Sequence, residues 1–170
     1  MKVLIVGGGG REHAIAWKCS QSKRVSKLYA APGNAGIGEL AECVDISVMD
    51  APALVKFAKD NEIDLTIIAP DDPLVAGVAD AFKEAGLRAF GPLKNAAIIE
   101  GSKAFSKDLM KKYNIPSAAY ETFDNADDAI NYLETAKMPI VLKADGLALG
   151  KGVLICNTLE EAKEGVKTLM

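Results

Sequence analysis

The 170-residue chain is 49% hydrophobic and 25% charged, a composition typical of a soluble globular protein with a buried core. Its net charge of -3 and pI near 5.3 provide no basic surface for a phosphate backbone, which argues against a nucleic-acid partner. The apolar runs fall far short of the ~20 residues of a membrane span and no signal-peptide pattern is present, so we expect a cytoplasmic protein without a membrane partner.

Short apolar runs alternate with helical patterns from residue 1 to about residue 92. The predicted strands are Lys2–Val6, Lys27–Ala31, a weak one at Val44–Val48, Asp64–Ala69 and Arg88–Phe90. The predicted helices are Arg11–Ser22, Ala51–Asn61 and one that carries Leu74, Val75, Val78 and Phe82 and ends at Gly86. Because this alternation implies crossover connections, we expect an α/β fold with a doubly wound, mostly parallel, Rossmann-like sheet.

The pattern changes after a short bridge at Asn95–Glu100. Ser102 is placed to cap the next helix, and the last helix runs to Met170 without a stop signal, so the chain is expected to be cut off there. The predicted elements are a helix at Lys103–Tyr113, a strand at Tyr120–Phe123, a helix capped by Asp124, a strand at Pro139–Ala144, a glycine-bearing loop at Asp145–Gly152, a strand at Val153–Cys156 and a helix with a capping box at Thr158 and Glu161. We expect two domains, 1–100 and 101–170.

The cysteines and the single histidine do not form a recognisable site. Cys19, Cys43 and Cys156 lack the spacing of a metal site or a disulfide framework, and we predict that they are buried thiols. His13 lies in a predicted helix without partner ligands, which favours a packing role.

A glycine-rich turn, Gly7–Gly10, joins the first predicted strand to the first predicted helix. Glycines at the start of a helix let backbone N–H groups approach an anion, so a phosphate is expected here, and a tight turn without a ligand is the alternative. The dinucleotide fingerprint requires a third glycine where this chain has Glu12, and no acidic residue ends the second strand, which argues against NAD.

Two further loops follow strands of the same predicted sheet, at Pro32–Gly36 and Ala69–Pro73. The carboxyl ends of parallel strands line one crevice, so these loops and the glycine turn are expected to face a common site. A carboxylate at Asp71 or Asp72 suits the hydroxyls or amine of a sugar phosphate, although Asp72 is equally placed to cap a helix that begins at Pro73.

A second glycine-bearing loop with lysines runs from Lys143 to Gly152. Ammonium groups offset phosphate charge and glycines allow close backbone approach, so this loop and Lys103 predict a nucleotide-phosphate site, with a solvated hairpin as the alternative. The loop is not a Walker A motif, because Gly152 stands where Ser or Thr is needed.

The chain contains, in this order, the segments VLIVGGGGREHAIAW, APGNAG, PLVAG, FGP, EGSKAF, IPSAAYETF and IVLKADGLALGKGV. Over essentially its whole length it resembles the glycinamide ribonucleotide synthetase family of the ATP-grasp superfamily. The resemblance implies a pre-ATP-grasp domain over residues 1–100 and the incomplete start of an ATP-grasp fold over 101–170, with part of the lid from about residue 124. One departure is Ala69-Pro70-Asp71, where the family usually has Gly-Pro-Glu.

What the resemblance implies is an ATP-dependent ligase that joins glycine to 5-phosphoribosylamine in purine biosynthesis, through a glycyl phosphate. It assigns the ATP phosphates to Lys103, Lys143, Gly150, Lys151 and Gly152. It assigns the phosphate and ribose of the substrate to Gly9, Gly10, Arg11, Glu12, Asn34 and Asp71.

The same resemblance places the ligands of Mg²⁺ or Mn²⁺ beyond residue 170. We therefore expect no metal ligand or catalytic residue within the chain, and no ligase turnover by the chain alone. Two alternatives remain open at this point: another purine-pathway ATP-grasp enzyme that acts on a different ribonucleotide, and a phosphosugar-binding module without catalysis.

Overall fold

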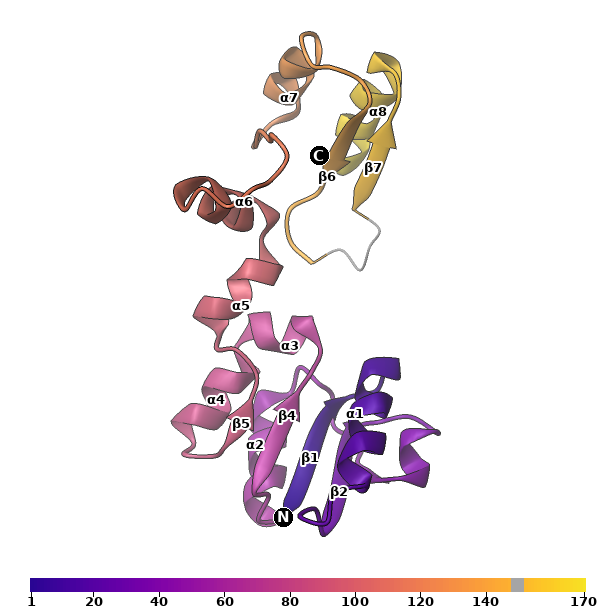
Figure 1. Cartoon of the computed structure of the whole chain (residues 1–170), viewed down its shortest axis with the longest axis vertical. Helices are drawn as coiled ribbons and strands as arrows, with labels where there is room; N and C mark the ends of the chain where they lie inside the picture. Colours follow the sequence, from indigo (N-terminus) through magenta and orange to yellow (C-terminus); the bar gives the residue numbers. More distant parts are fainter. Residues whose placement is uncertain (148–151) are drawn as a thin grey trace. The chain divides into compact units, whose positions relative to one another are not determined.

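The computed structural model describes residues 1–147 and 152–170 (Figure 1). The chain divides into two compact units, Met1–Ile98 (unit 1) and Ile99–Met170 (unit 2). Within these described residues, no helix has both the length and the apolar character that crossing a membrane requires.

Unit 1 is built on a five-stranded sheet with the spatial order β3-β2-β1-β4-β5, in which every neighbouring pair is parallel. The strands are β1 (Lys2–Gly7), β2 (Lys27–Pro32), β3 (Glu42–Cys43), β4 (Leu65–Ile68) and β5 (Ala89–Phe90). In the register, Ile5 of β1 lies between Ala30 of β2 and Ile67 of β4. The strand order changes direction at β1, which places the ligand crevice of such a sheet outside the carboxyl ends of β1 and β4. The predicted doubly wound α/β fold is confirmed.

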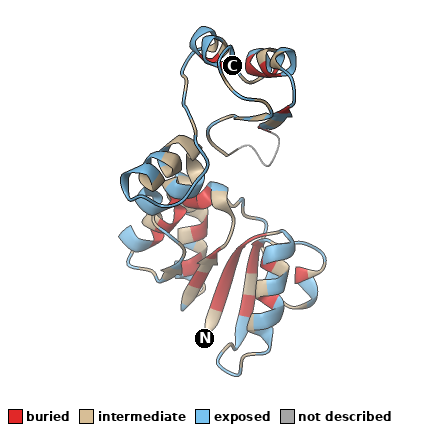
Figure 2. Ribbon diagram, turned by 45° about the horizontal axis from the view of Figure 1, so that its top comes forward, coloured by how far each residue is buried: buried red, intermediate tan, exposed pale blue. Residues whose placement is uncertain are grey.

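Helices cover both faces of this sheet, which explains why β1 is buried without interruption from Val3 to Gly7. They are α1 (Gly10–Ser20), a 3₁₀ turn η1 (Ile37–Glu39), α2 (Ala51–Asp60), α3 (Asp71–Ala76), α4 (Val78–Glu84) and α5 (Lys94–Gly101). Leu4 and Val6 pack into one core with Phe82, whereas Val3 and Ile5 pack into a second core on the opposite face. Figure 2 shows the buried residues concentrated along the strands of unit 1.

Three sequence predictions for unit 1 were wrong. The single helix through residues 74–82 is two helices, because Gly77 adopts a left-handed conformation (φ 98°) and its N–H donates to the Pro73 and Leu74 carbonyls. The weak strand Val44–Val48 is absent: β3 is two residues long and ends before it, Val44 N–H still donates to the Ala30 carbonyl of β2, and the apolar side chains of the segment pack on the core. The bridge Asn95–Glu100 is part of α5.

Unit 2 contains a two-stranded antiparallel hairpin with two helices packed on one face. Its elements are α6 (Lys103–Lys112), α7 (Ala126–Leu133), β6 (Ile140–Lys143), β7 (Val153–Cys156) and α8 (Leu159–Leu169). The core is formed by residues of α7 and α8, such as Leu133 and Val166, with Cys156 of the hairpin. This packing leaves the other face of the hairpin, which carries Val141 and Ile155, exposed.

Two predictions for unit 2 were wrong, and two predicted helix caps were right. Tyr120–Phe123 is not a strand, and the Phe123 ring instead packs against Tyr132 with centroids 5.2 Å apart. Asn125, not Asp124, caps α7 by accepting a hydrogen bond from the Asp128 N–H. Further caps follow the prediction: the hydroxyls of Ser102 and Thr158 accept hydrogen bonds from Phe105 N–H and Glu161 N–H.

Candidate functional site

The loop after β2 is fastened to the glycine turn after β1. The Gly33 N–H donates to the Gly7 carbonyl at 3.1 Å, and Asn34 Nδ2 donates to the Gly8 carbonyl at 2.8 Å. Asn34 Oδ1 also accepts a hydrogen bond from the Ile37 N–H at 2.9 Å. Asn34 therefore stabilises its own loop through Oδ1 and binds the glycine turn after β1 through Nδ2.

Arg11 connects the glycine turn to the loop after β4. Its Nη1 donates to the Ala69 carbonyl at 2.9 Å and to Asp71 Oδ1 at 3.2 Å. The two side chains are 59% and 43% exposed, so the ion pair lies at the surface and remains accessible to an incoming ligand. The structure thus brings together three loops that the sequence separates by tens of residues.

Asp71 and Asp72, which the sequence left as alternatives, have different surroundings. Helix α3 begins at Asp71 with Pro70 at its N-cap, and no side-chain hydrogen bond caps it. The predicted capping role of Asp72 is therefore wrong, and Asp71 is the carboxylate that contacts Arg11.

Glu12 differs from the other residues predicted to face the sugar phosphate, because its side chain is buried. Its Oε2 accepts a hydrogen bond from the Gly9 N–H at 2.7 Å, and the residue is 4% exposed. A helix N-terminus leaves its first N–H groups without intrahelical partners, and Glu12 satisfies one of them. The buried carboxylate thus stabilises the conformation of the glycine turn through its hydrogen bond with Gly9.

We predict that Glu12→Ala lowers the free energy of unfolding of unit 1 by about 2 kcal/mol, because a buried charge-assisted hydrogen bond is lost. Urea titration followed by fluorescence of Trp17, the one tryptophan in the sequence, measures this change. Glu12→Gln keeps an acceptor oxygen and is expected to lose about half as much. Glu84→Ala removes an exposed carboxylate of α4 and serves as the control. Equal stability of Glu12→Ala and wild type would contradict the role given to this carboxylate.

The three cysteines and His13 differ in how far they are buried. Burial raises the pKa of the Cys19 and Cys156 thiols, so both favour the unreactive protonated form. Cys43 is exposed and Cys19 is only half-buried, which corrects the prediction that all three thiols are buried. His13 is half-buried and its ring lies against Gly36, as a packing role requires.

In unit 2, the predicted phosphate lysine Lys103 begins α6 and contacts the loop that follows β6. Its Nζ donates to the Gly146 carbonyl at 2.6 Å, and its N–H donates to Asp145 Oδ1 at 2.6 Å. Asp145 also accepts hydrogen bonds from the Ala104 N–H at 3.2 Å and the Ser102 hydroxyl at 2.9 Å. Nothing in the sequence pattern assigned a role to Asp145.

Hydrogen bonding sets the protonation of Asp145. Partial burial acts to raise the pKa of this carboxyl, but the hydrogen bonds from Ala104, Ser102, Gly146 and Lys103 together lower it below the ordinary value of 3.8. Since the folded-state pKa is lowered, the stabilisation is present above the ordinary carboxyl pKa and is lost as the pH falls through the lowered one. The carboxylate is therefore charged throughout the neutral range.

The second predicted lysine, Lys143, lies at the end of β6 on the exposed face of the hairpin. It pairs with Val153, and Val141 pairs with Ile155, so these four residues alternate with the core-facing ones. Val141, Val153 and Ile155 are 48%, 40% and 71% exposed. One face of unit 2 thus carries a lysine beside three apolar side chains.

The loop between the hairpin strands is described only at its ends. The Ala144 N–H donates to the Gly152 carbonyl at 2.8 Å, which closes the base of the loop, and Gly152 is buried. Gly150 and Lys151 lie outside the described residues. Among residues 1–147 and 152–170, no group of three or more His, Cys, Asp or Glu side chains is arranged to hold a metal ion.

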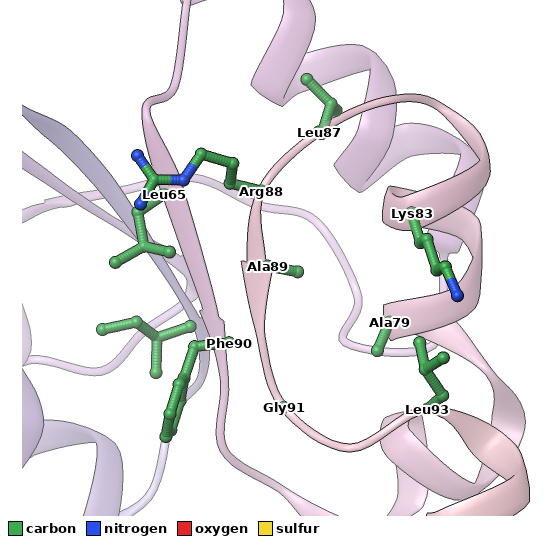
Figure 3. Close-up of a pocket in the computed structure, with 10 residues that line it drawn as sticks. Leu65, Ala79, Lys83, Leu87, Arg88, Ala89, Phe90, Gly91 and Leu93 are labelled. Atoms are coloured by element: carbon green, nitrogen blue, oxygen red, sulfur yellow. The ribbon is translucent and has the colours of Figure 1, made fainter.

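A hollow of about 870 Å³ lies at the β5 edge of the unit 1 sheet (Figure 3). It is lined by Leu65, Ile67, Ala79, Lys83, Leu87, Arg88, Ala89, Phe90, Gly91 and Leu93. Of the predicted site residues that the structure describes, none lines this hollow. The polar groups of unit 1 that could orient a phosphosugar gather instead at the carboxyl ends of β1, β2 and β4.

Comparisons with known proteins identify both halves of the chain. Residues 1–100 match the family "Phosphoribosylglycinamide synthetase, N domain", and residues 101–170 match "Phosphoribosylglycinamide synthetase, ATP-grasp (A) domain". The chain is 56% identical over its entire length to the phosphoribosylamine–glycine ligase of Caldanaerobacter subterraneus and 54% identical to that of Haemophilus influenzae. It spans 41% and 40% of the length of these two curated relatives.

A solved structure gives the same result in three dimensions. The phosphoribosylamine–glycine ligase of Thermotoga maritima superposes with a TM-score of 0.75 at 32% identity, covering 96% of this chain and 38% of that protein. Agreement of sequence over the full chain and of fold over nearly all of it confirms the resemblance inferred from the ordered motifs. The chain therefore belongs to the phosphoribosylglycinamide synthetase family, with the N domain over residues 1–100 and ATP-grasp (A) domain sequence over residues 101–170.

Proposed function

We propose that this chain supplies the phosphosugar- and nucleotide-binding parts of an ATP-dependent ligase that joins glycine to 5-phosphoribosylamine in purine biosynthesis. The observation that carries the proposal is its 56% identity to a phosphoribosylamine–glycine ligase across all 170 residues. Another purine-pathway ligase and a non-catalytic module explain this match less well, since both halves match the same family.

Unit 1 is assigned the phosphosugar. The N-terminus of α1 presents N–H groups without intrahelical partners and a favourable partial charge, so Gly9 and Gly10 with Arg11 suit the phosphate. Asn34 and Asp71, on the two neighbouring loops, suit the ribose hydroxyls and the amine. In this assignment Glu12 does not contact the ligand but stabilises the glycine turn by its hydrogen bond with the Gly9 N–H.

Unit 2 is assigned the nucleotide. The exposed hairpin face offers Val141 and Ile155 to the flat apolar base and Lys143 to the phosphates. Lys103, at the start of α6, is the second phosphate lysine. Gly150, Lys151 and Gly152 remain assigned to the phosphate loop by the family resemblance.

The proposed reaction has two displacements. The glycine carboxylate attacks the γ-phosphorus of ATP, the bond to the ADP oxygen breaks and glycyl phosphate forms. The amine of phosphoribosylamine then attacks the carbonyl carbon, phosphate leaves, and the nitrogen loses a proton to give the amide. Lysines at the phosphates reduce the repulsion between the attacking carboxylate and the polyphosphate. ATP is the co-substrate, and Mg²⁺ is expected with it but is assigned to no residue of this chain.

The test is Lys143→Ala in the full-length ligase, assayed by glycine- and ATP-dependent formation of glycinamide ribonucleotide. Loss of a charged contact to phosphate is expected to lower kcat/KM for ATP roughly 10- to 100-fold while the circular dichroism spectrum is unchanged. Lys137→Ala removes another exposed lysine of the same unit and is the matched control. Wild-type kcat/KM in Lys143→Ala would refute the nucleotide assignment, and absence of ligase activity in the wild type would refute the function.

A further inference from the structure

Asp145 connects two segments of unit 2 that lie far apart in the sequence. One oxygen accepts hydrogen bonds from the Lys103 and Ala104 N–H groups, and the other accepts one from the Ser102 hydroxyl. The residue therefore satisfies two amides of the first turn of α6, which have no intrahelical partners. Its own backbone belongs to the loop after β6, so the carboxylate ties that loop to the helix.

The Asp145 carboxylate contacts one of the two lysines that were assigned to the nucleotide, Lys103, and lies close in sequence to the other, Lys143. Lys143 ends β6 two residues before Asp145, and Lys103 is bound to Asp145 through its main-chain N–H. The side chain of Lys103 contacts the same loop, because its Nζ donates a hydrogen bond to the carbonyl of Gly146, the residue after Asp145. One carboxylate therefore fixes the start of α6 at the entrance of the glycine-bearing loop.

We propose that Asp145 is a positioning residue for nucleotide binding, which holds Lys103 at the entrance of the β6–β7 loop before the phosphates arrive. The inference rests on the proposed nucleotide site of unit 2. A phosphate oxygen replaces the Gly146 carbonyl as the acceptor for Lys103 Nζ, while the Asp145 contacts to the α6 main chain persist. Pre-ordering of this kind lowers the entropy cost of binding and acts on substrate and transition state alike.

This role makes a specific prediction for ATP kinetics. In the full-length ligase, Asp145→Ala is expected to raise the KM for ATP about tenfold and to change kcat less than about twofold, because uniform binding is lost. Asp145→Asn keeps an acceptor oxygen for the two amides and is expected to restore the KM to within about threefold of wild type. A role confined to stability would lower the active fraction, and hence the apparent kcat, without moving the KM.

Amide hydrogen exchange without nucleotide tests the contact by itself. Asp145→Ala is expected to speed exchange at Lys103 and Ala104 about tenfold, and Asp145→Asn to leave it near wild type. Thr158→Ala removes the cap of α8 in the same unit and is the control, with ATP KM and α6 exchange expected at wild-type values.

An unchanged ATP KM in Asp145→Ala overturns the proposal, as does an equal rise in Thr158→Ala. Unchanged exchange at Lys103 and Ala104 overturns it as well. A wild-type enzyme without ATP-dependent turnover counts against the ligase function, whereas the exchange measurement still decides whether Asp145 fixes the start of α6.

Discussion

Gly8→Ala is expected to separate the loops after β1 and β2 and to remove phosphosugar binding by unit 1. A Cβ at this position would lie 2.5 Å from the Gly33 carbonyl oxygen and 3.2 Å from its carbonyl carbon. Both atoms are main chain, so the clash is relieved only by moving a loop. That movement breaks the hydrogen bonds from Gly33 N–H to Gly7 and from Asn34 Nδ2 to Gly8.

The expected loss of stability for Gly8→Ala is about 3 kcal/mol, at the upper end of the cost of overpacking. Urea denaturation followed by Trp17 fluorescence measures it, and titration with ribose 5-phosphate measures the binding. Gly10→Ala is the stability control, because a Cβ there meets nothing within 4 Å and alanine favours the first turn of α1. A Gly8→Ala protein as stable as Gly10→Ala would show that the two loops are not held against each other as described.

The sequence predicted best what depends on local pattern. The buried strand β1 and helix α2 follow from an apolar run and from a 3.6-residue period, and both were placed to within one residue. The hydroxyl of Ser102 caps α6 as its position before the helix predicted. The edge strand β3 was missed because it has only two residues and the segment after it is held by packing, whereas the equally short edge strand β5 was predicted to within one residue.

The contacts that build the candidate site could not be predicted from spacing. Arg11 and Asp71 are 60 residues apart in the sequence. Asp145 is 42 residues from Lys103, whose N–H donates a hydrogen bond to its carboxylate. The parallel topology explains why the three loops of unit 1 meet, which was expected from strand order alone. Packing decides which side chains of the turn are exposed and which are buried. The Glu12 side chain is buried, although that of its neighbour Arg11 is exposed.

Phe82→Ala is expected to be the most destabilising single substitution considered for unit 1. The side chain is completely buried on α4 and belongs to the core that includes Leu4 of β1 and Leu54 of α2. Truncation removes apolar contacts and leaves a cavity that the sheet and helices cannot fill, at a cost of about 3–5 kcal/mol.

Phe90→Ala provides the matched control, because this phenylalanine is 70% exposed and its removal is expected to change stability by less than about 0.5 kcal/mol. Trp17 reports on unit 1, so urea denaturation curves of both variants are compared through its fluorescence. If Phe82→Ala and Phe90→Ala unfold at the same urea concentration, α4 does not close the core on this face of the sheet. The loops at the carboxyl ends of β1 and β4 depend on that core, since both strands contribute to it with Val6 and Ile68. Weakened binding of ribose 5-phosphate by Phe82→Ala near its unfolding midpoint is therefore an expected secondary effect.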